Sequence, residues 1–221
     1  MELLWSSLRK RELADLVGDH LADVAFAVIV PAGPSLGSGK GWGIVDEAFD
    51  AVGTALCCAA AIRLGGAVQV LTTRSGLLDH FSPIMAGLEN ITAFLDGRGI
   101  DDDLLGSAFA ESWSLDARYP AELAGHAFVR GWSSLVFGTV VLTRPKQQDI
   151  TSAQTMEFAS NAAAAWPIAV RIGSFDSLLR FEAACRQEAE AQMGEGGLPA
   201  LWKLTEDRSK QYRRTAEQFI G

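Results

Sequence analysis

Cysteine and histidine are scarce in this sequence, with three of each among 221 residues. Cys57 and Cys58 are adjacent and Cys185 stands alone, so the chain has no CxxC pair of the kind that holds zinc or forms a redox couple. The three histidines have no mutual spacing that suggests a metal site or a proton relay. We therefore expect the cysteines to be small buried side chains of helices and the protein to have no metal site.

Positive charge and long apolar runs are also in short supply. The chain has 19 lysines and arginines and 27 acidic residues, which gives a formal net charge of −8. Such a chain repels the phosphate backbone of nucleic acids. The longest apolar runs, residues 24–30 and 136–142, are far shorter than the roughly 20 residues that cross a membrane. The first ten residues have no apolar signal core. These absences predict a cytoplasmic protein with no membrane span and no nucleic-acid partner.

Apolar runs alternate with amphipathic segments along most of the chain. An uninterrupted apolar run is typical of a strand covered on both faces, as in parallel sheets, and Gly65-Gly66 is the expected end of a long helix. The order predicts an α/β fold of three layers, a mostly parallel central sheet with helices on both faces. One domain is expected over residues 1–193, followed by a Gly-rich linker and a helical tail over residues 194–221. The expected strands are residues 24–30, 67–72, 135–142 and 168–172, and the expected helices are residues 7–21, 42–64, 88–95, 104–112, 121–132, 152–165, 175–193 and 201–219.

The loop after the first expected strand resembles two catalytic motifs and completes neither. A phosphate-binding loop needs four residues between its glycines and a hydroxyl after its lysine, but Gly33 and Gly39 are separated by five residues, and Gly41 follows Lys40. The run around Ser35 fits the Gly-x-Ser-x-Gly pattern of serine hydrolases, yet no histidine follows His126 to act as the late base. A serine hydrolase or a nucleotide-binding protein that uses residues 33–40 is therefore the alternative prediction, and a non-enzyme is favoured.

The same loop and several later segments also resemble the von Willebrand A domain, in the copine-like subgroup of tellurium-resistance proteins. Residues 31–40 align with the Asp-x-Ser-x-Ser loop of that family, and residues 140–149 align with its strand that ends in Thr-Asp-Gly. Residues 167–179 align with its final strand and helix, while residues 88–94 and 116–120 match two weaker motifs. The resemblance implies a Rossmann-like fold, a role in protein binding, and a bacterial stress-response or defence assembly.

The metal ligands of that family are mostly missing here. Pro31 and Gly33 replace the first aspartate and the first serine, Arg144 replaces the last aspartate, and only Ser35 remains. Divalent cations of this kind need carboxylate oxygens, so the resemblance implies a degenerate site with neither metal nor cofactor.

Basic side chains near the same expected sheet edge suggest what replaces the metal. Guanidinium groups bind carboxylates in a bidentate manner, so we expect a non-catalytic protein-interaction module that grips an acidic group of a partner. An oligomer through the C-terminal tail is also expected. The predicted binding residues are Ser35, Ser38, Lys40, Trp42, Arg74, Arg118, Thr143 and Arg144.

Overall fold

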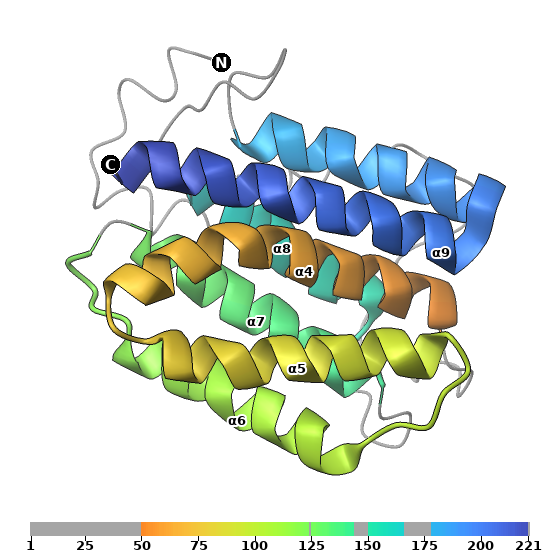
Figure 1. Ribbon diagram of the computed structural model, residues 1–221, viewed down its shortest axis with the longest axis horizontal. Coiled ribbons are helices and arrows are strands. Elements are labelled where there is room, and N and C mark those ends of the chain that lie inside the picture. Colours follow the sequence, from red (N-terminus) through yellow and green to blue (C-terminus); the bar gives the residue numbers. More distant parts are fainter. Residues whose placement is uncertain (1–49, 124, 144–149, 166–177, 221) are drawn as a thin grey trace.

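The computed structural model describes residues 50–123, 125–143, 150–165 and 178–220 of the chain. These ranges contain helices and no strand (Figure 1). The helices are α4 (Ala51–Arg74), α5 (Leu78–Leu95), α6 (Asp102–Arg118), α7 (His126–Leu142), α8 (Ser152–Ala165) and α9 (Leu178–Ile220).

The predicted α/β fold with a parallel sheet is wrong, because the described part of the chain consists of helices joined by loops and contains no strand. The resemblance to the von Willebrand A family is wrong for the same reason, because its Rossmann-like fold and degenerate metal site require a sheet. The expected strands 24–30 and 168–172 and the expected helix 7–21 lie outside the described residues. The implied stress-response or defence setting has no structural support and stays a prediction.

Two expected strands belong to helices. Residues 67–72 form the end of α4, and residues 135–142 form the second half of α7. Short apolar runs of Val, Leu and Thr fit a buried strand and a buried helix equally well when periodicity is the only guide. The error arose because both helices are buried on most of their circumference, which removes the polar face that reveals a helical period.

The expected helix end at Gly65-Gly66 is wrong as well, because α4 continues through both glycines to Arg74. Gly66 has a different role: a Cβ at this position would overlap the backbone carbonyl oxygen of Ser209 in α9. Gly131 in α7 similarly lies against α8, where its Cβ would be 2.8 Å from the Cα of Ala162. These glycines allow close contact between helices and do not terminate them.

Helix α4 is the centre of the bundle (Figure 1). It contacts α5, α7, α8 and α9. Helix α6 packs against both α5 and α7. Among the described helices only α4 is long and apolar enough to cross a membrane, and 78% of that apolar window is buried inside the bundle. A core helix of a globular domain has the same character, so the structure shows no membrane span.

Helix α9 is a hairpin of two arms. Its backbone leaves the helical region at Gly197, where φ is +67°, a value that favours glycine. Pro199 then lies in the first turn of the second arm, a position that proline tolerates. The predicted helices 175–193 and 201–219 are thus confirmed in outline, as residues 178–196 and 198–220. The predicted helix 152–165 is confirmed as α8.

Trp132 of α7 connects the core to the central helix. Its side chain is fully buried, its indole N–H donates to the carbonyl of Ala61 at 2.7 Å, and its ring stacks on Phe81 at 5.6 Å. The indole N–H therefore has a hydrogen-bond acceptor inside an apolar core. These contacts fix α4, α5 and α7 relative to one another.

Candidate functional site

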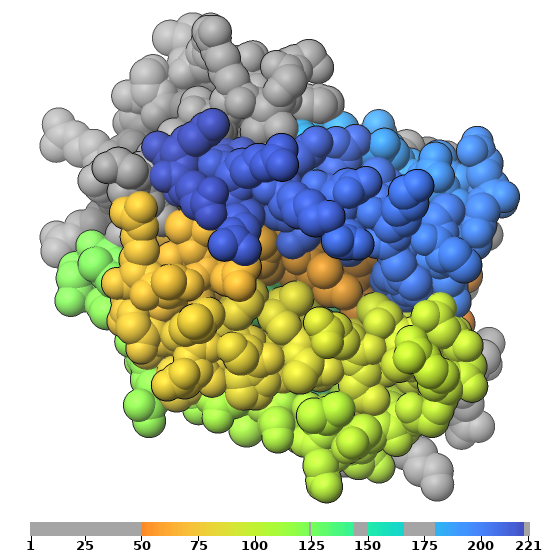
Figure 2. Space-filling model, viewed as in Figure 1, coloured from red at the N-terminus to blue at the C-terminus, as the bar shows by residue number. Residues whose placement is uncertain are grey.

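An open groove runs along α4 between α5 and the second arm of α9. Figure 2 shows part of α4 (orange) at the base of the hollow between α5 (yellow) and that arm (dark blue). The groove consists of two adjoining hollows of about 330 and 340 Å³, which share Gln69 and Ser209. We call this surface the α4 groove; it is lined by Ile62, Gly65, Gly66, Gln69, Phe81, Ser82, Met85, Ala86, Glu89, Thr92, Trp202, Thr205, Glu206, Ser209, Lys210 and Arg213.

The floor of the α4 groove includes apolar side chains from α4 and α5, with Ile62 in one hollow and Met85 in the other. Gly65 contributes no side chain, and a Cβ added to it would lie 3.3 Å from the sulfur of Met85. Ile62 and Met85 are both partly exposed on this floor. An unbranched methionine adapts its shape to different apolar neighbours, so this floor suits an apolar side chain from outside the chain.

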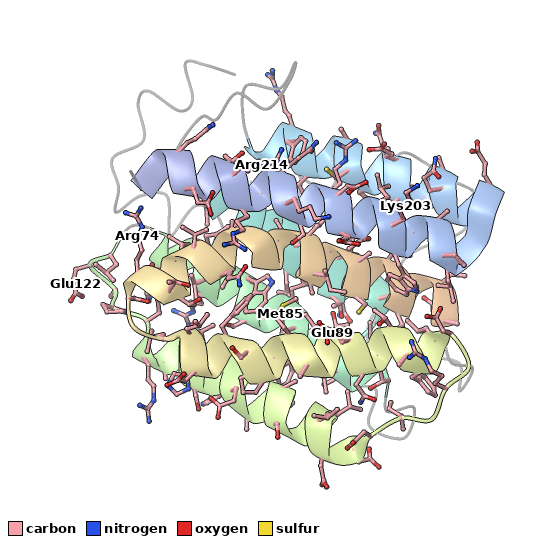
Figure 3. The ribbon with its side chains drawn as sticks, in the orientation of Figure 1. Arg74, Met85, Glu89, Glu122, Lys203 and Arg214 are labelled. Carbon is pink, nitrogen blue, oxygen red and sulfur yellow. The ribbon has the colours of Figure 1, made fainter. Side chains whose placement is uncertain are left out.

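The rim of the α4 groove carries charges of both signs, most of which are already paired. Lys210 lies 2.7 Å from Glu206, and this ion pair lowers the pKa of Glu206 and raises the pKa of Lys210. Arg213 lies 3.1 Å from Glu217 and donates to Gln69 at 3.4 Å. Glu89 is exposed and has no ion-pair partner in the described part of the chain; Figure 3 shows it near Met85, on the side of α5 that faces α4. The uncompensated charge of the rim is therefore negative.

Three of the groove hydroxyls have partners within their own helices. Ser82 donates to the carbonyl of Leu78 at 3.1 Å, Thr92 to that of Glu89 at 2.7 Å, and Thr205 to that of Leu201 at 2.7 Å. The residues that line the α4 groove include neither histidine nor cysteine. The groove lining thus offers no histidine base and no thiol nucleophile.

A fully buried polar network holds the wall of the groove in place. The guanidinium of Arg63 in α4 makes two hydrogen bonds to the carboxylate of Glu182 in the first arm of α9, one of them at 3.0 Å. Tyr212 in the second arm donates to the same carboxylate at 2.6 Å. Burial would lower the pKa of Arg63, but the charge and hydrogen bonds of Glu182 outweigh it and raise that pKa. Burial and the Glu182 charge also raise the pKa of Tyr212. The network joins α4 to both arms at one point.

The three cysteines are free and buried, as the sequence predicts. Burial raises the pKa of Cys57 and of Cys185 from 9.0 to about 12, and it raises the pKa of Cys58 as well. Only the thiolate reacts readily with thiol reagents. These side chains are consequently structural and unreactive in the folded protein.

We expect Ellman's reagent at pH 8 to modify the native protein only as fast as the protein opens, and to modify three thiols at once in denaturant. The same pKa shifts make stability fall in alkali: below pH 9 both states keep the thiol protons, whereas between pH 9 and about pH 12 only the unfolded chain loses them. Fast modification of any one cysteine in the native protein at pH 8 would contradict this expectation.

The structure leaves two of the three predicted binding residues that it describes at one end of the bundle and the third at the other end. Arg74 ends α4 and Arg118 ends α6, so both lie at the same end of the bundle, since α5 runs antiparallel to each. Thr143 caps α7 at the opposite end, is buried, and donates to the carbonyl of Val140 at 2.6 Å. Thr143 therefore shares no pocket with Arg74 or Arg118. Ser35, Ser38, Lys40, Trp42 and Arg144 lie outside the described residues.

The C-terminal tail packs on the bundle itself. Leu201, Tyr212 and Ala216 are completely buried there, and the indole N–H of Trp202 donates to Asp96 at 3.1 Å. The apolar face of the tail is thus occupied within the chain, and the predicted oligomer contact through it has no structural support.

Sequence reasoning missed the α4 groove. Its one sequence signal is the Gly65-Gly66 pair inside an apolar helical pattern, since glycine there costs helix stability and is usually kept for close packing or function. Among the described residues, no group of three or more His, Cys, Asp or Glu side chains is placed to hold a metal ion. Comparison with protein-family models, with curated proteins and with solved structures returns no match for this chain.

Proposed function

We propose that this chain is a non-catalytic protein-interaction module whose α4 groove binds an amphipathic helix of a partner protein. The observation that carries the proposal is a pair of partly exposed apolar side chains, Ile62 and Met85, one in each of the two adjoining open hollows between α5 and the second arm of α9. Apolar grooves of this kind accept helices whose apolar side chains recur at i, i+3, i+4 and i+7.

The charge of the rim specifies the partner further. Lys210 and Arg213 are neutralised by glutamates of their own helix, whereas Glu89 has no cationic partner among the described residues. A lysine or arginine at the edge of the bound helix would complement Glu89. The partner is therefore expected to present a basic residue, in contrast to the acidic group that the sequence predicted. We place the module in the cytoplasm, where the free state of all three cysteines is maintained.

The test uses two helical peptides that share leucines at i, i+3, i+4 and i+7 and differ by one edge residue, lysine or glutamate. We expect the wild-type protein to bind the lysine peptide more tightly, by up to about fivefold, in fluorescence anisotropy. Glu89→Lys should reverse this preference, because the rim charge changes sign. Met85→Glu should abolish binding of both peptides, because it places a carboxylate on the apolar floor.

The matched control is Arg214→Glu, an exposed charge change on the same α9 arm that does not line the groove. It should leave both affinities unchanged. If neither peptide binds, or if Met85→Glu binds as the wild type does, the α4 groove is not a helix-binding site.

A further inference from the structure

The outward face of α6 carries almost no charge. Between Asp103 and Asp116 its only charged side chain is Glu111, which turns toward α5 and lies 2.6 Å from His80. An exposed face of a helix in a globular protein is ordinarily rich in charged residues. We call the exposed surface the α6 face; it comprises Gly106, Ser107, Phe109, Ala110, Trp113 and Ala117.

Aromatic side chains give the α6 face its apolar character. Trp113 is 69% exposed and Phe109 is 39% exposed. Phe109 contacts Phe137 of α7, with ring centroids 4.9 Å apart, so the ring is held in place by the bundle. Leaving so much of an indole in water forgoes the burial energy that makes tryptophan a frequent anchor of interfaces. The α6 face therefore has the composition of an interface and not that of a solvated surface.

We propose that two copies of this chain associate through their α6 faces, with the two α6 helices antiparallel about a twofold axis near Ala110. Ala110 is the middle residue of α6. A twofold axis there places Trp113 of one copy over Gly106 and Ser107 of the other. Gly106 has open space where a Cβ would be, so a large side chain meets a small one twice across the axis, as an isologous interface requires.

The charges at the two ends of α6 favour a second copy as the occupant. Asp101, Asp102 and Asp103 lie at the N-terminal end, and Arg118 lies at the C-terminal end. Antiparallel pairing brings the acidic end of each helix to the basic end of the other. It also sets the two helix dipoles side by side in the favourable antiparallel orientation. The centre of the face is uncharged, so two chains of net charge −8 can meet there without direct repulsion.

This association is independent of the α4 groove, which is formed by other helices. Phe109 and Asp116 extend from α6 toward α7, where Phe109 contacts Phe137 and Asp116 lies 3.7 Å from Arg130. The groove lies between α4, α5 and α9. A negative result for helix binding in the α4 groove therefore does not contradict dimerisation through the α6 face, and the reverse also holds.

Sedimentation velocity over a wide range of concentrations tests the proposal with the full chain. We expect the wild type to reach a dimer of twice 23.6 kDa as concentration rises. Trp113→Ser and Gly106→Glu should raise the dimer dissociation constant by at least about tenfold. Glutamate is a better helix former than glycine, so Gly106→Glu keeps the fold. The matched control is Gly194→Glu, a change at another exposed helical glycine with open space around it, which should dimerise as the wild type does.

A charge exchange tests the antiparallel arrangement. Arg118→Asp alone should weaken the dimer, because it faces the acidic end of the other copy. Adding Asp103→Arg to the same chain should restore the dimer, because opposite charges meet again at both ends. A wild-type protein that stays monomeric, a dimer that survives Gly106→Glu, or an exchange that fails to restore the dimer would each overturn the proposal.

Discussion

Replacing Arg63 by methionine is expected to lower the free energy of unfolding by about 3–5 kcal/mol. Arg63 and Glu182 have side chains that are only 2% exposed, so the substitution leaves a carboxylate in the core with no cation beside it. The hydroxyl of Tyr212 remains as a donor to Glu182, but one neutral hydrogen bond does not compensate a buried charge. Urea unfolding followed by circular dichroism measures the loss.

The control for this prediction removes the whole network. The triple variant Arg63→Met, Glu182→Leu, Tyr212→Phe leaves neither a buried charge nor an orphaned hydroxyl, since replacing all partners by apolar groups of similar shape is often close to neutral. We expect it to be clearly more stable than Arg63→Met alone. A triple variant as unstable as the single one would mean that packing around Arg63, and not the ion pair, supplies the stability.

The substitution Gly66→Ala is expected to destabilise the protein by about 3 kcal/mol, the upper part of the usual range for overpacking. An added Cβ would overlap the backbone carbonyl oxygen of Ser209. A backbone atom cannot rotate out of the way as a side chain does, so the second arm of α9 must move away from α4. Because that arm forms one wall of the α4 groove, binding of the lysine peptide should weaken as well.

Gly65→Ala is the matched control, one residue earlier in the same helix. Its added Cβ would approach only the sulfur of Met85 and the ring of Trp132, at 3.3 and 3.4 Å. Methionine is flexible, and alanine gains about 1 kcal/mol over glycine in a helix interior. We expect Gly65→Ala to unfold at the same urea concentration as the wild type or slightly higher. Equal stability of the two variants would show that α4 and α9 do not touch at Gly66.

Local signals in the sequence were sufficient for several helices. Residues 152–165 carry a helical pattern from end to end and form α8. The glycines around residue 197 interrupt two amphipathic segments, and a positive φ at Gly197 separates the two arms of α9 there. These features depend on neighbours along the chain, which is why single-sequence reasoning reaches them.

The excess of negative charge and the free state of the cysteines also follow from the sequence by itself. Whether residues 67–72 and 135–142 became strand or helix did not, because burial on several sides gives both the same apolar pattern. Tertiary structure alone brought Arg63 to Glu182, which is 119 positions away. It also decided that Gly66 is a contact point for α9, because the need for glycine there depends on the nearby backbone of Ser209, which is distant in sequence. The α4 groove and the α6 face follow from these packing choices and from no motif in the chain.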